Sequence, residues 1–432
     1  MKESLMDIRL FFGLTMIENN LTNTIDHLFR NEYGKVVAVL TNKFGISHLE
    51  QIEDVAQDTF LKAMQVWGYK SVPDNPTAWL YRVANNALID VLRRGKKMDF
   101  LDDKHLNNNG EVSPEREVSL DDTISDSQLK MIFACCHPSL SEEYQVILSL
   151  KLIGGFSNKE LAEALLKKEE TVAKSFTRAK KKFRDEVQFL QIPVQMGLQS
   201  RLFKVLRIIY LLFTEGYAAT TGSSVLKRDI CYEALRLALL LKENQYCKHP
   251  NLTALIALMC FHASRFDARL NEQGELVTLE HQDRSKYNQE LVRIGIRHLE
   301  SSGTEDKLPS NYHLEAARSY YHCVAKTFQK TDWKSILELY DIQLKRQYSP
   351  MLALNQIIPY AKVHGAAEGI KGLRTLQKKT DFSSSGLFFA IKAELLMEAD
   401  NQDEYEAALK KAIELTKNEL VRKHLKKKLP GI

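Results

Sequence analysis

Helical periodicity is the feature that most constrains the fold of this chain. Apolar residues recur at intervals of three and four in long stretches, and only 10 prolines occur among 432 residues. This spacing places apolar side chains along one face of a helix, whereas proline inside a helix removes a backbone hydrogen bond. The sequence therefore predicts an all-α protein that is long enough for two or three domains.

Residues 52–67 are predicted to form a helix with two contrasting faces. One face is an apolar stripe of the kind that packs into a core. On the opposite face Asp54, Asp58, Leu61 and Gln65 align at helical spacing. Acidic residues around an exposed leucine indicate a docking surface for a basic, partly apolar partner helix.

Residues 75–94 follow with a helix start signal, because Asn75 can cap a helix and Pro76 suits its first turn. The stripe predicted to face inward is Leu80, Val83, Ala84, Ala87 and Val91. The other side offers cations for phosphates, amides for base edges and rings on which unpaired bases can stack. The residues that supply these groups are Trp79, Tyr81, Arg82, Asn85, Asn86, Arg93 and Arg94.

A second candidate for nucleic-acid binding lies in residues 155–184. Ser157 and Glu160 make a capping box, a short turn covers residues 166–168, and a second helix covers residues 169–184. This arrangement is typical of a helix-turn-helix, whose second helix enters the major groove. The residues predicted to face the groove are Thr171, Lys174, Ser175 and Arg178, and those predicted to contact phosphates are Lys180, Lys181, Lys182 and Arg184.

The alternative for residues 155–184 is an ordinary basic surface helix, and the capped preceding helix and tight turn favour DNA binding instead. Between the two candidate regions, residues 96–127 are acidic and contain few large apolar side chains. This composition predicts a linker.

In this order, the acidic helix, the aromatic and arginine-rich helix, the acidic linker and the helix-turn-helix resemble bacterial sigma-70 factors of the extracytoplasmic-function group. EDVAQDTFLKAMQVW resembles the polymerase-binding helix of region 2, NPTAWLYRVANNALIDVLRR its minus-ten helix, and FSNKELAEALLKKEETVAKSFTRAKKKFR resembles region 4. The resemblance spans residues 24–184. The later text (FACCHP, YLLFTEGYAAT and residues 267–283) resembles the subgroup with a long helical carboxy-terminal extension.

The resemblance implies an alternative sigma factor, not an enzyme, that binds core RNA polymerase and promoter DNA. Its domains would be region 2 in residues 1–95, the linker in 96–127, region 4 in 128–190, a helical extension in 191–310 and tetratricopeptide-like (TPR-like) repeats in 311–432. The extension would regulate the factor or recruit a partner.

The resemblance also implies a role for particular residues. Contacts with the β′ clamp helices of polymerase would come from Asp54, Gln57, Asp58 and Leu61, and the β flap would be a further polymerase partner. The minus-ten element would be held by Trp79, Tyr81, Arg82, Asn85, Asn86, Arg93 and Arg94, with a flipped base received by the loop at residues 68–75. The minus-thirty-five element would be read by Thr171, Lys174, Ser175, Arg178, Lys181 and Lys182.

The carboxy-terminal part shows a faint repeat of helix, small turn and helix, beginning at Ser349 and again at Ser384. Tetratricopeptide repeats have this length and placement of small residues, and a generic array of helical hairpins is the alternative.

Other features argue against cofactors and membranes. Six scattered cysteines show no repeated metal-ligand spacing, so Cys135 and Cys136 are interpreted as core residues, and no metal or cofactor is expected. No apolar run is long enough to span a membrane and no leader is evident, so we expect a cytoplasmic protein.

One polar set remains: His262, Arg265, Asp267, Arg269, Gln282, Asp283 and Arg284. No nucleophile with its base and no phosphate loop accompanies it, which favours a structural polar network over a ligand site or a catalytic site. Glu215–Tyr217 is interpreted as a turn between helices. The two alternatives to a sigma factor are a conventional helix-turn-helix regulator with a helical-repeat sensor and a helical enzyme.

Overall fold

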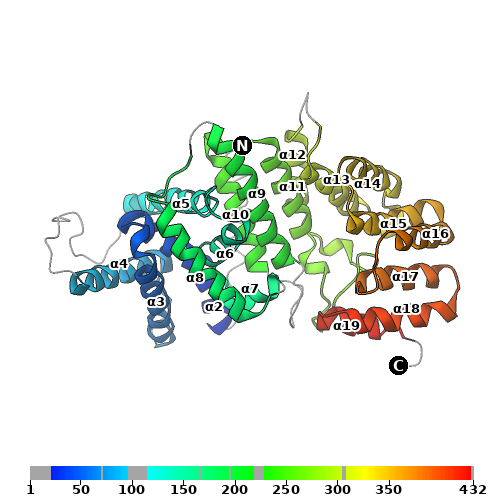
Figure 1. Ribbon diagram of the computed structural model, residues 1–432, viewed down its shortest axis with the longest axis horizontal. Coiled ribbons are helices and arrows are strands. Elements are labelled where there is room, and N and C mark those ends of the chain that lie inside the picture. Colours follow the sequence, from blue (N-terminus) through cyan, green and yellow to red (C-terminus); the bar gives the residue numbers. More distant parts are fainter. Residues whose placement is uncertain are drawn as a thin grey trace. The chain divides into compact units, whose positions relative to one another are not determined.

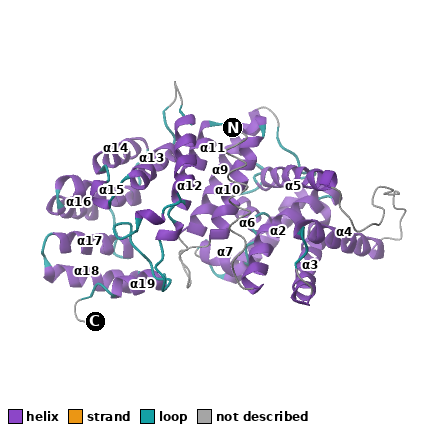
Figure 2. Ribbon diagram, turned by 180° about the vertical axis from the view of Figure 1, so that it is seen from behind, coloured by secondary structure: helices purple, strands orange, loops and turns teal. Residues whose placement is uncertain are grey.

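The computed structural model describes residues 21–69, 72–95, 114–165, 167–193, 196–217, 228–303 and 308–429. Within these ranges every regular element is helical, apart from one isolated antiparallel bridge between Leu270 and Leu276 (Figure 2). The all-α prediction is therefore confirmed. Contacts divide the chain into two compact units, the first made of Met1–Leu212 and Tyr232–Cys247, the second of Phe213–Cys231 and Lys248–Ile432.

The first unit contains the helices that carry the predicted interfaces (Figure 1). Helix α2 packs against α3, α4 and α5, while α8 packs against α6 and α7. Their bounds are α2 Leu21–Phe44, α3 Leu49–Tyr69, α4 Pro76–Gly95, α5 Pro114–Cys135, α6 Glu142–Leu152, α7 Asn158–Ala164 and α8 Glu169–Glu186. Two further helices, α9 (Met196–Tyr217) and α10 (Arg228–Glu243), each contribute to both units.

The apolar stripe of α3 is buried as the sequence predicts, since Ile52, Val55, Ala56, Phe60, Ala63 and Trp67 are all at most 5% exposed. Helix α4 begins as predicted, with Asn75 Oδ1 accepting a hydrogen bond of 2.9 Å from the backbone N–H of Ala78. Its inward face differs from the prediction. Leu80, Ala84 and Leu88 are fully buried, whereas Val91 is 40% exposed, so the helix packs through a stripe spaced by four residues.

Part of the segment predicted as a linker is helical. Residues 96–113 lie outside the described residues, but α5 begins at Pro114 and continues past Ser127 to Cys135. Proline suits the first turn of a helix, and acidic residues near a helix amino end are stabilised by its dipole. The acidic composition of the segment is therefore compatible with the start of a helix, which ends in the buried residues Met131, Ile132 and Phe133.

In the second unit, successive helices pack against each other from α11 to α19. Helix α11 (Pro250–Ala263) is buried on nearly all sides and contacts both α12 and α13. The others are α12 Gln289–Ser301, α13 Asn311–Val324, α14 Trp333–Arg346, α15 Pro350–His364, α16 Ala366–Lys379, α17 Gly386–Glu398, α18 Gln402–Leu415 and α19 Glu419–Lys426. Short 3-10 turns, η3 (Phe266–Ala268) and η4 (Arg284–Lys286), lie between α11 and α12.

The two helix pairs predicted in the carboxy-terminal part are present as α15–α16 and α17–α18. A single residue, Gly365, joins α15 to α16 with a φ of 96°, a conformation that favours glycine. Gly369 lets α16 approach α15 closely, because a Cβ there would lie 2.7 Å from the Cβ of Ala361. Their assignment as TPR-like repeats stays a prediction.

Candidate nucleic-acid interface

Helix α3 presents the predicted docking residues to solvent. Asp54, Gln57 and Asp58 are exposed, and Leu61 is 58% exposed although it is a large apolar residue. Met64, one turn further on, is also an exposed large apolar residue. An apolar patch bordered by carboxylates on a rigid helix can bind a partner that offers apolar side chains and cations.

Helix α4 exposes most, but not all, of the residues predicted to contact nucleic acid. Arg82, Asn86, Arg93 and Arg94 are exposed, and Tyr81 is half-buried. Trp79 is half-buried, and its ring centroid lies 5.2 Å from that of the buried Trp67 of α3. Aromatic pairs at this separation stabilise packing. The ring of Trp79 thus packs α4 against α3 while part of its surface stays exposed.

Asn85 is a correction to the predicted interface, because it is only 3% exposed. Its Oδ1 accepts a hydrogen bond of 3.2 Å from Lys43 Nζ on α2, and its Nδ2 lies 3.4 Å from Asn86 Oδ1. A buried amide needs such partners to offset its desolvation. Asn85 therefore helps to hold α4 against α2, and its neighbour Asn86 is the exposed amide.

The predicted helix-turn-helix is formed by α7 and α8. Ser157 and Glu160 make the expected capping box, with hydrogen bonds of 3.0 Å from Ser157 N to Glu160 Oε2 and 3.1 Å from Glu160 N to Ser157 Oγ. Val172, Phe176, Ala179 and Phe183 form the buried stripe of α8. The opposite face exposes Thr171, Lys174, Arg178, Lys181 and Lys182. Ser175 is half-buried and donates a hydrogen bond of 3.2 Å to Glu143.

Two basic residues of α8 that were predicted to contact phosphates instead contact acids of α3. Lys180 Nζ lies 2.8 Å from Glu53 Oε2, and Arg184 Nη1 lies 3.2 Å from Glu50 Oε1. Glu53 is 5% exposed, and this burial raises the pKa of its carboxyl while the ammonium of Lys180 lowers it. Both cations are thus directed toward α3 rather than toward the exposed face of α8.

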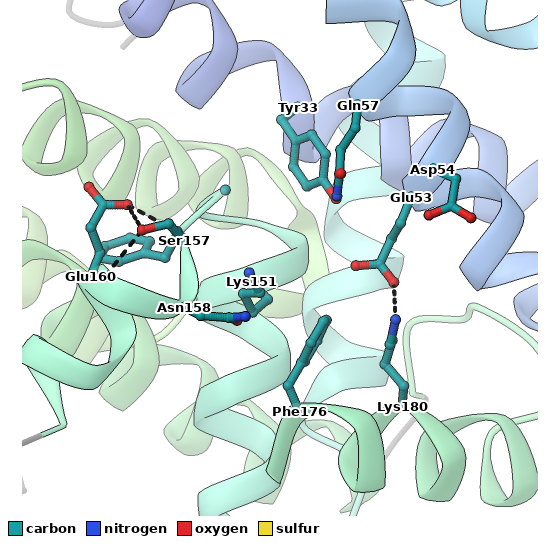
Figure 3. Close-up of a pocket in the computed structure, with 12 residues that line it drawn as sticks. Tyr33, Glu53, Asp54, Gln57, Lys151, Ser157, Asn158, Glu160, Phe176 and Lys180 are labelled. Carbon is teal, nitrogen blue, oxygen red and sulfur yellow. Dashed lines mark hydrogen bonds and ion pairs between the residues drawn. The ribbon is translucent and has the colours of Figure 1, made fainter. Parts of the chain in front are cut away.

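A cavity of about 640 Å³ lies between α3 and the helix-turn-helix (Figure 3). Tyr33, Asp54 and Gln57 line one side of it, and Lys151 and Phe176 line the other. Burial is the main reason that the pKa of Lys151 is lowered and that of Tyr33 is raised. Asp54 and Gln57 therefore border both solvent and this cavity, which separates the two predicted binding elements.

Sequence reasoning missed Glu53 and Lys151 as members of this cavity. Glu53 lies beside Ile52 and Val55 in the apolar stripe of α3, and an acid at the edge of such a stripe was the available signal. Such a carboxylate needs a partner cation from elsewhere in the fold. That partner, Lys180, lies 127 positions further along the chain.

Three further kinds of functional feature are reactive cysteines, metal sites and membrane-spanning helices. The six cysteines are free and buried, which confirms that Cys135 and Cys136 are core residues. Among the described residues, no three histidine, cysteine or acidic side chains gather into a candidate metal site. None of the helices described is long and apolar enough to cross a membrane.

Three family models match successive parts of the chain. The model described as "Sigma-70 region 2" matches residues 28–98, and "Sigma-70, region 4" matches residues 130–183. The "Family of unknown function (DUF6596)" matches residues 201–303. The first match covers α3 and α4, and the second covers α7 and α8.

The curated relatives are of two kinds: one protein that matches most of this chain, and sigma factors that match about a third of it. An uncharacterized protein of Rhizobium meliloti (strain 1021) is 29% identical over 378 residues, which cover 86% of this chain and 87% of that protein. RNA polymerase sigma factor YlaC of Bacillus subtilis (strain 168) is 27% identical over 146 residues, 33% of this chain and 80% of the relative. ECF RNA polymerase sigma factor SigW of the same organism is 27% identical over 158 residues, 34% and 80% respectively. No solved structure matches the chain significantly.

Proposed function

Because this chain belongs to the sigma-70 family, with region 2 and region 4 domains of the extracytoplasmic-function type ahead of a DUF6596 extension, we propose how its exposed residues act in transcription initiation. The protein is an alternative sigma factor that directs initiation by binding core RNA polymerase and promoter DNA. Sigma factors are not enzymes, and the polymerase carries out the chemistry. We also infer a cytoplasmic location, because core RNA polymerase is the partner.

In the proposal, helix α3 binds core polymerase through Asp54, Gln57, Asp58 and Leu61, with the β′ clamp helices as the partner surface. The observation that carries this assignment is an apolar residue, Leu61, that is 58% exposed on a helix one turn after the exposed carboxylate of Asp58. A protein that binds only DNA has no use for an acidic surface of this kind, because DNA phosphates would repel it. A conventional DNA-binding regulator therefore leaves the α3 face unexplained.

The proposed promoter contacts lie on two helices. On α4, Arg82, Asn86, Arg93 and Arg94, together with the partly exposed rings of Trp79 and Tyr81, contact the minus-ten element. On α8, the exposed face with Thr171, Lys174, Arg178, Lys181 and Lys182 contacts the minus-thirty-five element, with the amino end of the helix in the major groove. Ser175 contributes at the edge of this surface. The β flap and a regulator bound by the extension are further proposed partners.

Transcription in vitro with core polymerase tests the proposal. Asp58→Arg, which reverses a charge on the α3 face, is expected to weaken binding to core polymerase and reduce initiation, while minus-thirty-five DNA binding by α8 persists. The matched control is Glu272→Arg, the same charge change at an exposed acid of the second unit. Equal affinity of wild type and Asp58→Arg for core polymerase would refute the assignment of this face.

A further inference from the structure

The second unit contains a group of arginines that the proposed function does not use. Arg265 and Arg269 flank the turn η3 and are 8% and 9% exposed, and Arg284 begins η4 and is half-buried. We call these three residues the arginine cluster. Tyr217 at the end of α9, His262 on α11 and His322 on α13 contact it. Tyr217, interpreted from the sequence as part of a turn, in fact belongs to the last turn of α9.

Every hydrogen bond that the arginine cluster makes within the described residues goes to a neutral acceptor. Arg265 donates to the hydroxyl of Tyr217, and its Nη2 lies 3.2 Å from His262 Nδ1. Arg269 donates to the carbonyl oxygen of Tyr217, and its guanidinium lies 3.9 Å from the centroid of the Tyr217 ring. Arg284 donates to the carbonyl oxygen of His322.

The acids nearest to these arginines in sequence are engaged elsewhere. Asp267 Oδ1 lies 2.6 Å from Arg228 Nη1. Asp283 caps η4, accepting hydrogen bonds of 2.9 Å from Ser285 N and 2.7 Å from Ser285 Oγ. Within the part of the chain that the structure describes, none of the three arginines forms an ion pair. The sequence favours a structural polar network here, and in the structure the arginines of this network contact neutral acceptors rather than the two acids.

Burying cations without a counterion is costly, and arginine cannot escape the cost by losing its proton. The neighbouring imidazoles add no negative charge. Burial and the nearby arginines lower the pKa of His262 and lower that of His322 to about 3, so both rings are neutral near pH 7. The site therefore holds a concentrated positive charge that the described residues do not balance.

The cluster also contains donors that lack acceptors. Arg265 Nε and Arg284 Nη2 are buried and form no hydrogen bond with any residue that the structure describes, and His322 Nδ1 is a third buried nitrogen without a partner among these residues. Such groups are rare in folded proteins and call for an explanation. Tyr217, His262 and Arg284 keep part of their surface exposed, so an anion can reach the cluster from solvent.

We propose that the arginine cluster is a binding site for a phosphate group. Phosphate offers several acceptor oxygens and the charge that the cluster lacks, and guanidinium groups bind it through paired hydrogen bonds. The hydroxyl of Tyr217 is placed to contribute another donor. The site lies within residues 201–303, which match the family of unknown function, and the inference does not depend on the sigma-factor assignment.

Isothermal titration of the full-length protein at constant ionic strength tests this site, with inorganic phosphate in one arm and adenosine monophosphate in the other. We expect saturable binding with one site per chain. Arg265→Met should weaken it at least about tenfold, the loss expected for a charge-assisted hydrogen bond. Equal binding in both arms identifies free phosphate as sufficient, and much tighter binding of the nucleotide identifies a phosphate ester.

Two variants separate a binding role from a structural one. Arg228→Met removes a nearby exposed cation that is paired with Asp267, and it should leave phosphate affinity unchanged. Arg284→Met, at a half-buried position, repeats the test if Arg265→Met does not fold. Without phosphate, both cluster variants should unfold at the wild-type temperature or above, because each removes an unneutralised charge. Absence of binding by both probes, or binding that both cluster variants retain, would overturn the proposal.

Discussion

Lys180 of α8 and Glu53 of α3 form an ion pair of 2.8 Å in which both side chains are mostly buried, with exposed fractions of 16% and 7%. The ammonium of Lys180 also lies 4.8 Å from the centroid of the Phe176 ring. The pair thus joins α3, the region 2 helix proposed to bind polymerase, to α8, the region 4 helix proposed to read the minus-thirty-five element. Its acid is removed from solvent and depends on this cation for neutralisation.

Lys180→Met is expected to destabilise the first unit by about 2–4 kcal/mol, because it leaves the Glu53 carboxylate buried without its cation. Chemical denaturation, together with hydrogen exchange of the α3 amides, measures the loss. Lys182→Met is the matched control, since Lys182 is exposed and its pair with Glu186 one turn away is a surface pair that contributes little to stability. Equal losses in the two variants would mean that the Glu53 pair contributes no more than a surface pair.

The pH dependence of stability should also report on Glu53. Because burial raises its pKa in the folded state, the folded protein binds more protons than the unfolded chain at pH values just above the ordinary glutamate pKa. The contribution of Glu53 to stability is therefore present at low pH and is lost as pH rises through the raised pKa. Lys180→Met should enlarge this loss and extend it to higher pH, since Lys180 holds that pKa down.

Comparison with Glu53→Gln, which cannot titrate, isolates the effect from that of other groups. Denaturation of both proteins from about pH 4 to about pH 8 gives the difference in the free energy of unfolding. We expect wild type to lose stability relative to Glu53→Gln as pH rises. A difference that stays constant, or that changes in the opposite direction, would contradict a raised pKa.

Asn85 and its neighbour Asn86 should respond differently to substitution by alanine. Asn85→Ala removes the acceptor of Lys43 and leaves a cavity, so a loss of about 1–2 kcal/mol in stability is expected. Asn86→Ala, at an exposed position, should leave stability within about 0.5 kcal/mol while weakening binding to single-stranded minus-ten DNA. The measurements are thermal unfolding and DNA titration of a polymerase complex. If Asn85→Ala weakened DNA binding and Asn86→Ala lowered stability instead, Asn85 would belong to the DNA interface.

Arg178→Ala should weaken recognition of the minus-thirty-five element by about 1–3 kcal/mol, the cost of losing a base contact. Arg178 is exposed near the middle of α8, on the side opposite Phe176 and Ala179. Footprinting of promoter DNA with the polymerase complex measures the change. An unaltered footprint, with wild-type stability, would show that another face of α8 reads the DNA.

Helical periodicity predicted the buried stripe of α3 because six apolar positions left only one possible inner face. On α4 two stripes were possible, one through Leu80, Ala84 and Leu88 and one ending at Val91. The choice between them depends on contacts with α2 and α3, including the bond from Lys43 to Asn85. Such contacts join distant positions, so local spacing could not reveal them.

Local sequence also could not show which partners the charged residues contact. The basic run of α8 was visible in the sequence, but whether Lys180 faces DNA or Glu53 depends on how α8 packs against α3. In the second unit, the sequence places Asp267 and Asp283 close to three arginines but does not show which of these charged groups are in contact. The turns η3 and η4 direct both acids elsewhere, and only the three-dimensional structure shows that the arginine cluster lacks a counterion.

Substitutions at two glycines of α16 test how closely α15 and α16 are packed. A Cβ at Gly369 would lie 2.7 Å from the Cβ of Ala361, an atom that cannot rotate away. A Cβ at Gly372 would lie 3.0 Å from Cδ1 of Ile357, the end of a flexible side chain. Gly369→Ala should therefore lose about 1–3 kcal/mol through overpacking. Gly372→Ala should gain up to about 1 kcal/mol, because alanine favours the helix. Thermal unfolding of the two variants measures both effects, and a gain in stability from Gly369→Ala would show that the two helices can move apart without cost.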